Sequence, residues 1–363
     1  IKKLYSNCGL CPRKCGINRY VNTGFCRAGT LPKLARAALH MWEEPVLSAS
    51  GGSGAVFFSN CTLSCVFCQN HDISSGGFGR EISIDALSDV FLELEAQGAQ
   101  NIDLITASHY LPSVIAALDK VKHRLHIPIV YNCGGYENVV SVRMLDGYID
   151  IYLPDIKYFS DETAVRYSSA PHYYETAVNA VSEMIAQVGA PVMEKSKNDC
   201  FSNDSCRKAS IMKSGVIIRH MVLPAHRRES IALMNAMAHD LDVNSFLISL
   251  LSQYTPFYKA LTDDGILVNQ HESTFYTEYA NSMKRAHSRI KQLFKTALVY
   301  QAHIPTYPSG HWLFGFASKK YDPRTDLKAD WWNSLGLKTK YYNTILHTGC
   351  FAIPNNVRDE LRE

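Results

Sequence analysis

The chain has 363 residues, of which 46% are hydrophobic and 20% are charged, a composition typical of folded globular proteins. Its formal net charge of +3 is too small to indicate binding to nucleic acid or to an acidic membrane surface. No apolar run approaches the roughly 20 residues that span a bilayer, and the polar N-terminus lacks the apolar core of a secretory signal. We therefore expect a cytoplasmic protein with one large domain or two ordinary ones, and no nucleic-acid or membrane partner.

Seven of the eleven cysteines fall in two tight clusters, which in a long chain without an export signal indicates metal ligands rather than disulfides. The first cluster has the spacing C-x2-C-x3-C-x10-C and comprises Cys8, Cys11, Cys15 and Cys26. Four thiolates are a complete tetrahedral set for structural zinc or for an iron–sulfur cluster. The spacing does not choose between zinc and iron–sulfur.

Six nearly continuous apolar runs follow and alternate with stretches that have helical periodicity. Apolar runs of this kind predict parallel strands buried on both faces, and the alternation predicts βαβ units. The sequence therefore predicts an α/β fold, a partial (βα)6 barrel whose site lies at the carboxyl ends of its strands. The predicted strands are residues 55–60, 102–107, 127–132, 148–156, 215–223 and 245–254, and the helices are 83–98, 111–125 and 175–189.

The character of the chain changes near residues 253–257, after which Tyr and Trp become more frequent. We predict a strand over 263–273, an amphipathic helix over 275–294 and a strand pair within 296–323. These patterns predict three parts: a Cys-rich segment over residues 1–50, the partial barrel over 51–255 and a separate C-terminal fragment over 256–363.

The second cysteine cluster, CTLSCVFC, places Cys61, Cys65 and Cys68 directly after the first predicted strand and has no fourth cysteine nearby. Three thiolates can bind three irons of a [4Fe–4S] cluster and leave the fourth iron open to a small molecule. Catalytic metal sites keep such an open position, whereas structural sites are closed. A zinc knuckle or buried free thiols are the alternatives.

In this position the C-x3-C-x2-C spacing resembles that of radical S-adenosylmethionine enzymes. The phrases WEEP, CVFCQN, YLPDIKY and IIRHMVLP are similar to glycyl-radical activating enzymes of the pyruvate formate-lyase type, over roughly residues 5–255. The resemblance implies a radical SAM oxidoreductase that cleaves S-adenosylmethionine to a 5′-deoxyadenosyl radical, with that molecule and a [4Fe–4S] cluster as cofactors. It also implies an electron donor such as flavodoxin or ferredoxin, and a glycyl radical enzyme as the protein substrate.

The same resemblance assigns cofactor contacts to several residues. Phe67, directly before the last cysteine, matches an aromatic residue near the adenine. Thr106, Ser108 and His109 stand where the family commonly has a Gly-Gly-Glu stretch for the amino group; the sequence departs from the family there, and His109 is equally compatible with an ordinary buried histidine. Asn132 matches a ribose contact, although a plain turn fits as well.

Asp155 and Lys157 match an Asp-x-Lys pair at the end of the fourth strand, which the resemblance makes catalytic residues at the barrel mouth. The alternative is a structural ion pair at the end of the barrel. Arg219 and His220 alternate on the fifth predicted strand, so only one of them can point inward.

From about residue 257 onward the phrases DGILVNQHES, MKRAHSRIKQLF and IPTYPSGHWLFGFASKKYDP resemble the C-terminal part of spermidine synthases. That family has a Rossmann-like fold and transfers an aminopropyl group from decarboxylated S-adenosylmethionine to a polyamine, and Gln270 and Tyr307 match positions in its polyamine pocket. Its first half, with the Gly-rich turn and the catalytic aspartate, has no counterpart here. We therefore expect a truncated Rossmann-like fragment that transfers no aminopropyl group alone. Three explanations of the fragment are left open. It could be a degenerate remnant, the result of a joined gene model, or half of a site that is shared in an oligomer.

Overall fold

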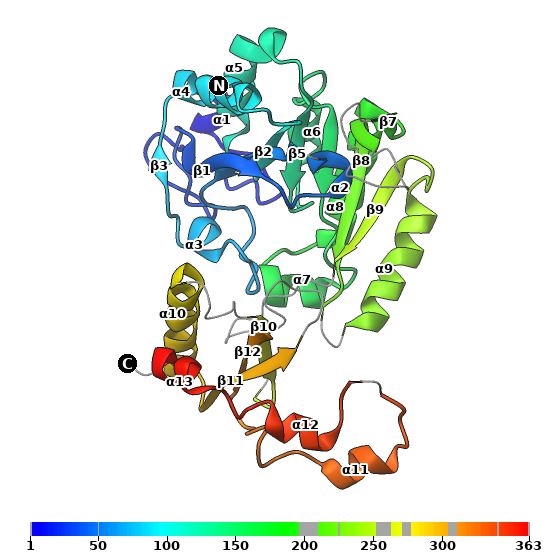
Figure 1. Ribbon diagram of the computed structural model, residues 1–363. Coiled ribbons are helices and arrows are strands. Elements are labelled where there is room, and N and C mark those ends of the chain that lie inside the picture. The colour runs from blue at the N-terminus through cyan, green and yellow to red at the C-terminus, as the bar shows by residue number, and fades with distance from the viewer. Residues whose placement is uncertain are drawn as a thin grey trace. The chain divides into compact units, whose positions relative to one another are not determined.

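The computed structural model describes residues 2–49, 51–195, 210–223, 226–251, 263–270, 277–303, 311–339 and 341–361. The chain divides into two compact units, Ile1–Tyr254 and Thr255–Glu363 (Figure 1). Tyr307, predicted as a residue of the polyamine pocket, lies outside the described residues.

Unit 1 is a mixed α/β structure with a nine-stranded sheet. Its strands are β1 (Lys33–His40), β2 (Ser53–Phe58), β3 (Arg80–Glu81), β4 (Ile102–Ile105), β5 (Ile129–Cys133), β6 (Ile151–Pro154), β7 (Val192–Lys195), β8 (Ser210–Met221) and β9 (Phe246–Leu251). Its helices are α1 (Lys2–Ser6), α2 (Pro45–Ser48), α3 (His71–Ser74), α4 (Ile84–Ala96), η1 (Ser108–Tyr110), α5 (Leu111–Val121), η2 (Lys122–Arg124), α6 (Val139–Arg143), α7 (Asp161–Ser168), α8 (Tyr173–Val188) and α9 (Arg227–Asp240).

All six predicted strands of this region are present, and they run parallel in the order β2, β4, β5, β6, β8, β9. Three further strands were not predicted: β1 and β3 extend the sheet beside β2, and β7 pairs with the start of β8, all antiparallel. A large, mostly parallel sheet is thus established, and the partial barrel stays a prediction.

Helix α4 shows why the predicted helices form. The Ser83 hydroxyl accepts a hydrogen bond from the Ala86 N–H and caps the first turn. Leu87, Phe91 and Leu94 recur at helical spacing and are all buried. Gly98 follows the end of the helix in the left-handed region that glycine adopts without strain.

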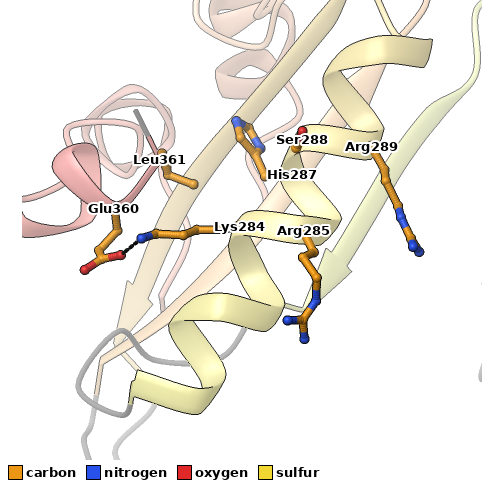
Figure 2. A pocket seen from close by; sticks show the side chains of 7 residues that line it. All are labelled: Lys284, Arg285, His287, Ser288, Arg289, Glu360 and Leu361. Carbon is orange, nitrogen blue, oxygen red and sulfur yellow. Dashed lines mark ion pairs between the residues drawn. The ribbon is translucent and has the colours of Figure 1, made fainter. Parts of the chain in front are cut away.

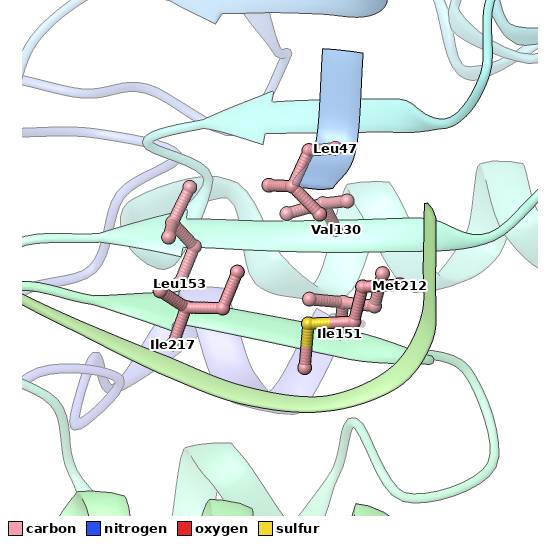
Figure 3. Packing of buried hydrophobic residues seen from close by; sticks show 6 residues of the cluster. All are labelled: Leu47, Val130, Ile151, Leu153, Met212 and Ile217. Atoms are coloured by element: carbon pink, nitrogen blue, oxygen red, sulfur yellow. The ribbon is translucent and has the colours of Figure 1, made fainter. Parts of the chain in front are cut away.

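The core of unit 1 lies where β5, β6 and β8 meet helix α2. Figure 3 shows Leu47 of α2 directed toward Val130 of β5, with neighbouring apolar side chains from β6 and β8 beside them. The cluster comprises Leu47, Val130, Ile151, Leu153, Met212 and Ile217, each no more than 2% exposed. It fixes the three strands whose carboxyl ends carry the polar residues described below.

Unit 2 has a three-stranded antiparallel sheet in the order β10, β12, β11. Its elements are β10 (Ile266–Gln270), α10 (Thr277–Leu293), β11 (Thr296–His303), β12 (His311–Ser318), α11 (Ala329–Ser334), α12 (Thr344–Gly349) and α13 (Asn355–Leu361). Helices α10 and α13 pack on one face through Met283, Val299, Leu313 and Val357. In the described part of unit 2 every strand pair is antiparallel, so the truncated Rossmann-like arrangement also stays a prediction.

Within the described residues, no helix combines the length and the apolar character that crossing a membrane requires.

Replacing Leu153 by Ala should lower the free energy of unfolding of unit 1 by about 2–5 kcal/mol, because the packed strands around it cannot close the resulting cavity. Urea unfolding followed by circular dichroism measures the change. Ile231→Ala on α9, where the side chain is 54% exposed, is the control and should cost less than about 0.5 kcal/mol. Equal losses in the two variants would contradict this placement of the core.

Candidate functional site

A cavity of about 350 Å³ in unit 1 lies at the carboxyl ends of β5, β6 and β8. These strand ends supply Asn132, Asp155 and Arg219, and the loop after β6 adds Lys157. Parallel strands bring such residues together because their carboxyl ends share one edge of the sheet. The turn after β5 passes so close to β6 that a Cβ atom on Gly135, whose φ is +76°, would lie 2.0 Å from the Asp155 carbonyl oxygen.

Arg219 is the centre of the polar network in this cavity. Its Nε donates to Asp155 Oδ1 at 2.9 Å, and its Nη2 donates to Asn132 Oδ1 at 2.6 Å. Its Nη1 lies 3.3 Å from Glu43 Oε1, a residue of the loop between β1 and α2. Lys157 donates to the second oxygen of Asp155. The three side chains that Arg219 contacts, Asp155, Asn132 and Glu43, therefore come from three separate parts of the chain.

The surroundings set the charges of these groups. Burial raises the pKa of Asp155, but Arg219 and Lys157 outweigh burial and hold that pKa below its ordinary value. Burial lowers the pKa of Lys157 and of Arg219, but the Asp155 carboxylate outweighs it and raises both. All three groups are charged at neutral pH.

Asp103 on β4 is a buried acid behind this network. Burial, and then the nearby Glu43 carboxylate, raise its pKa well above the ordinary value. Asn132 donates to its Oδ2 at 3.3 Å, and its Oδ1 has no hydrogen-bond partner among the described residues. A protonated Asp103 leaves two carboxylates, Glu43 and Asp155, to balance the two cations of the cavity.

The structure brings together six of the residues predicted as site residues. All six line the cavity: Cys65, Phe67, Cys68, Asn132, Asp155 and Lys157. Sequence reasoning named Arg219 only as one of two alternatives, and the structure decides between them. His220 points away, because its Nδ1 donates to the Ile156 carbonyl and its Nε2 accepts from the Ser230 hydroxyl.

Thr106, Ser108 and His109 are not among the residues that line the cavity. The Ser108 hydroxyl donates to Glu137 Oε1 at 2.5 Å. His109 Nε2 donates to the Ser59 carbonyl at 2.8 Å, and burial lowers the pKa of His109 to about 4. His109 is therefore a neutral buried histidine, and its Nδ1 has no hydrogen-bond partner among the described residues.

Glu137 is a fully buried acid that sequence reasoning missed. It also accepts a hydrogen bond from the Tyr131 hydroxyl at 3.2 Å, through Oε2. Burial raises the pKa of Glu137 to about 7, although its hydroxyl donors oppose the rise. The only sequence signal near Glu137 is the pair of glycines before it, and glycines do not predict that a nearby acid is buried.

The three cysteines of the second cluster each have a different local hydrogen-bond donor. Cys61 Sγ accepts from the Leu63 N–H at 3.4 Å, Cys65 Sγ from the Ser168 hydroxyl at 2.9 Å, and Cys68 Sγ from the Ser74 hydroxyl at 3.2 Å. Burial raises the pKa of Cys61 to about 12 and also raises that of Cys65. Both groups are therefore protonated thiols in this arrangement.

The four cysteines of the first cluster line a small cavity of about 10 Å³. Cys8, Cys11 and Cys26 are buried, while Cys15 is exposed and its thiol contacts the Cys8 carbonyl. Across the described residues, no three His, Cys, Asp or Glu side chains form a group that could hold a metal ion.

Unit 2 has a mainly aromatic pocket of about 320 Å³ on the sheet face opposite α10. Tyr300 stacks on Phe314 with ring centres 5.3 Å apart and also contacts Phe351. His347 Nε2 donates to the Pro323 carbonyl, so its Nδ1 is the acceptor for the Tyr342 hydroxyl at 2.9 Å. Gln270 is the last residue of β10, two positions after Val268, which lines this pocket.

A second pocket of unit 2, of about 410 Å³, is lined by basic residues of α10. Figure 2 shows Lys284 directed toward Glu360 of α13, with which it forms an ion pair, while Arg285 and Arg289 point away from that pair. These cations do not converge on one point, so we assign no ligand to this pocket.

Comparison with known proteins places a recognised domain across the start of unit 2. Residues 249–329 match the spermine/spermidine synthase domain. The polyamine aminopropyltransferase of Clostridium botulinum strain Eklund 17B is 72% identical over 110 residues, and that of Alkaliphilus oremlandii is 68% identical over 110 residues. Each alignment covers 30% of this chain and 39% of the relative, so the chain spans well under half the length of these relatives.

Similarities to solved structures are weak. The spermidine synthase of Thermotoga maritima is 26% identical with a TM-score of 0.28, covering 40% of this chain and 59% of that one. Streptococcus suis SuiB bound to its precursor peptide SuiA is 10% identical with a TM-score of 0.37, covering 64% of this chain and 45% of that one. Scores this low support no conclusion.

These findings overturn the function predicted from the cysteine motif. The matched domain and the curated relatives are aminopropyltransferases, which are transferases, so the prediction of a radical SAM oxidoreductase of the glycyl-radical activating type is wrong. The alternative prediction, aminopropyl transfer, is the better supported one. The electron donor and the glycyl radical enzyme rested on the overturned reading and are taken no further.

The predicted cofactors are corrected for the same reason. A [4Fe–4S] cluster on Cys61, Cys65 and Cys68, and zinc or a second cluster on the first four cysteines, need sulfurs that converge. The first four cysteines line one small cavity, and Cys65 and Cys68 line another, but the described residues contain no group of three side chains that could hold a metal ion. Each sulfur of the second cluster accepts a hydrogen bond from its own donor. The prediction of S-adenosylmethionine as a cofactor bound to such a cluster is therefore also corrected.

Replacing Arg219 by Met should lower the free energy of unfolding of unit 1 by about 3 kcal/mol at pH 7, because Asp155 and Glu43 lose their shared partner. That figure is the low end for buried pairs, since these side chains keep 12–18% exposure. The loss should shrink as the pH falls, because an Asp155 that has lost its arginine takes up a proton more readily and then no longer needs a cation.

Urea unfolding at pH 7 and at pH 4 tests this expectation. Arg143→Met breaks the ion pair with Glu183, in which the arginine is 65% exposed, and should cost less than about 1 kcal/mol. A loss for Arg219→Met that does not change with pH would contradict the role assigned to Asp155.

Replacing Glu137 by Gln should make unit 1 less sensitive to rising pH. In the wild type the folded acid keeps its proton up to about pH 7, whereas the unfolded acid loses it near pH 4.3. The Glu137 contribution to stability therefore falls as pH rises between these values, by up to about 1.4 kcal/mol per pH unit. Because Gln stays neutral, the free energy of unfolding of the variant, measured with urea, should rise relative to that of the wild type from pH 5 to pH 8. The control Glu162→Gln, at an exposed position, should show no such rise.

Proposed function

We propose that this chain takes part in aminopropyl transfer to a polyamine and that unit 2 holds the polyamine acceptor. The observation that carries the proposal is the 72% identity to a polyamine aminopropyltransferase over 110 residues. At that identity the local fold and most side-chain contacts of the segment should be shared with the relative. The chain spans 39% of that relative, so the proposal concerns the share of the site that this segment can supply.

The aromatic pocket of unit 2 suits an aliphatic diamine. Tyr300, Phe316, Tyr341 and Phe351 surround a space of about 320 Å³ with apolar rings that can cover a methylene chain. The ring faces attract an ammonium group at the end of such a chain by about 0.5–2 kcal/mol each. We assign the polyamine to this pocket.

The chemistry of the transfer fits an apolar acceptor site. The lone pair of an unprotonated amine attacks the aminopropyl carbon that is bonded to the sulfonium of decarboxylated S-adenosylmethionine. The carbon–sulfur bond breaks, the neutral thioether leaves with the bonding electrons, and the new secondary amine releases a proton. Removing an amine from water lowers its pKa, and therefore raises the fraction that is able to attack.

Two residues singled out in the sequence remain proposals. Gln270 ends the strand beside the pocket, but its side chain lies outside the described residues, as does all of Tyr307. Asp155 and Lys157 of unit 1, predicted as catalytic, belong to the cavity of that unit, and we propose no step of the transfer for them.

Putrescine should bind the full chain, as measured by isothermal titration calorimetry, and 1,4-butanediol, which lacks the charges, should bind far more weakly. Tyr341→Leu should weaken putrescine binding by about 2- to 30-fold, because it removes one ring face while keeping apolar bulk. Tyr341→Phe keeps the ring and should bind as the wild type does.

Tyr20→Leu is the matched control, since Tyr20 is an equally exposed tyrosine of unit 1. No measurable heat with putrescine, or equal binding of the diol, would overturn the proposed function.

A further inference from the structure

The two edge strands of the unit 2 sheet differ in how their outer main-chain groups are hydrogen bonded. At the β11 edge, the Gln301 N–H donates to the Cys350 carbonyl at 2.9 Å and its side chain donates to the Ala352 carbonyl. The His303 N–H donates to the Tyr341 hydroxyl. The segment around α12 therefore covers this edge with hydrogen-bond partners.

The opposite edge, β10, has no such cover in the part of unit 2 that the structure describes. Among the described residues, 266–270 pair with β12 alone, so within that part of the chain the other side of β10 presents main-chain groups without a strand partner. Unpaired edges attract other strands, and proteins protect them with charges, proline or bulges. The sequence of β10, Ile-Leu-Val-Asn-Gln, contains neither charge nor proline, and its register with β12 has no bulge.

The side chains of β10 also indicate a missing neighbour. Ile266 is 47% exposed although it is apolar and stands in a strand, and Val268, which also lines the aromatic pocket, is 49% exposed. Asn269 has a buried side-chain oxygen that meets no donor within the described residues. An additional strand beside β10 would cover the two apolar side chains and bring main-chain N–H groups to this edge.

The comparisons indicate what could provide that strand. The C. botulinum relative contains a segment that is 72% identical to 110 residues of this chain. That segment makes up only 39% of the relative. The rest of that relative is polypeptide that accompanies nearly the same segment. That remaining polypeptide is unmatched in the alignment, so any neighbour that it supplies to the segment lies outside the matched residues.

We infer that the β10 edge is a docking surface for a second polypeptide carrying the part of an aminopropyltransferase that this chain does not match, which adds a strand beside Ile266–Gln270. This inference rests on the proposed function, because it completes the same site. Unit 2 then contributes the polyamine pocket, and the partner contributes the binding of the sulfonium donor.

Co-expression tests the inference. The full chain is produced with the part of the C. botulinum relative that lies outside the 110 matched residues, and a tag on the latter is used for purification. We expect the full chain to co-purify in a one-to-one complex, measured by light scattering after gel filtration. Val268→Lys places an ammonium at the edge and should reduce recovery of the complex about tenfold or more.

Ile345→Lys, at an exposed apolar position of α12, is the matched control and should leave recovery unchanged. Circular dichroism confirms that Val268→Lys is folded, and Ile266→Lys at the start of the strand is the second variant. No complex, a complex indifferent to both β10 variants, or pairing of two copies of this chain through β10 would overturn the inference.

Putrescine binding by the full chain alone separates the two proposals. Binding without a complex overturns only the docking surface. A complex sensitive to Val268→Lys in a chain that does not bind putrescine supports the docking surface and overturns the proposed polyamine pocket.

Discussion

The buried guanidinium of Arg219 is the interaction on which the cavity of unit 1 depends. It joins Asp155 at the end of β6, Asn132 at the end of β5 and Glu43 in the loop before α2. Because a buried charge is costly without partners, these contacts fix the loop relative to the strands as well as neutralising the arginine. In the apolar cluster, Leu47 of α2 is directed toward Val130. This packing holds the helix that follows the Glu43 loop against the same strands.

The strands of this unit were predictable because a parallel strand buried on both faces leaves an almost continuous apolar run. All six such runs form strands, with ends within a few residues of those expected. β1, with Lys33 and Arg36 in it, lies toward the end of the sheet and is partly exposed, so its sequence has no such run. β7 pairs with residues 210–214 of β8, which precede the strand predicted over 215–223.

The cavity was predictable in part, for reasons of the same kind. Asp155, Lys157 and Asn132 directly follow or end strong apolar runs, and the topology therefore brings them to one edge. Glu43 lies in a loop whose path no local pattern reveals. Ser108 also stands shortly after a predicted strand, but it begins η1. Its hydroxyl donates a hydrogen bond to Glu137 and does not line the cavity.

Function was misjudged because a short motif and a long identity carry different amounts of information. C-x3-C-x2-C fixes three residues and two spacings, and three thiols that accept hydrogen bonds from Leu63, Ser168 and Ser74 also meet that pattern. An identity of 72% over 110 residues constrains a complete run of strands, helices and their packing. Such an identity is nevertheless local, because the matched segment spans 39% of the relative and therefore constrains the fold and packing of unit 2 alone.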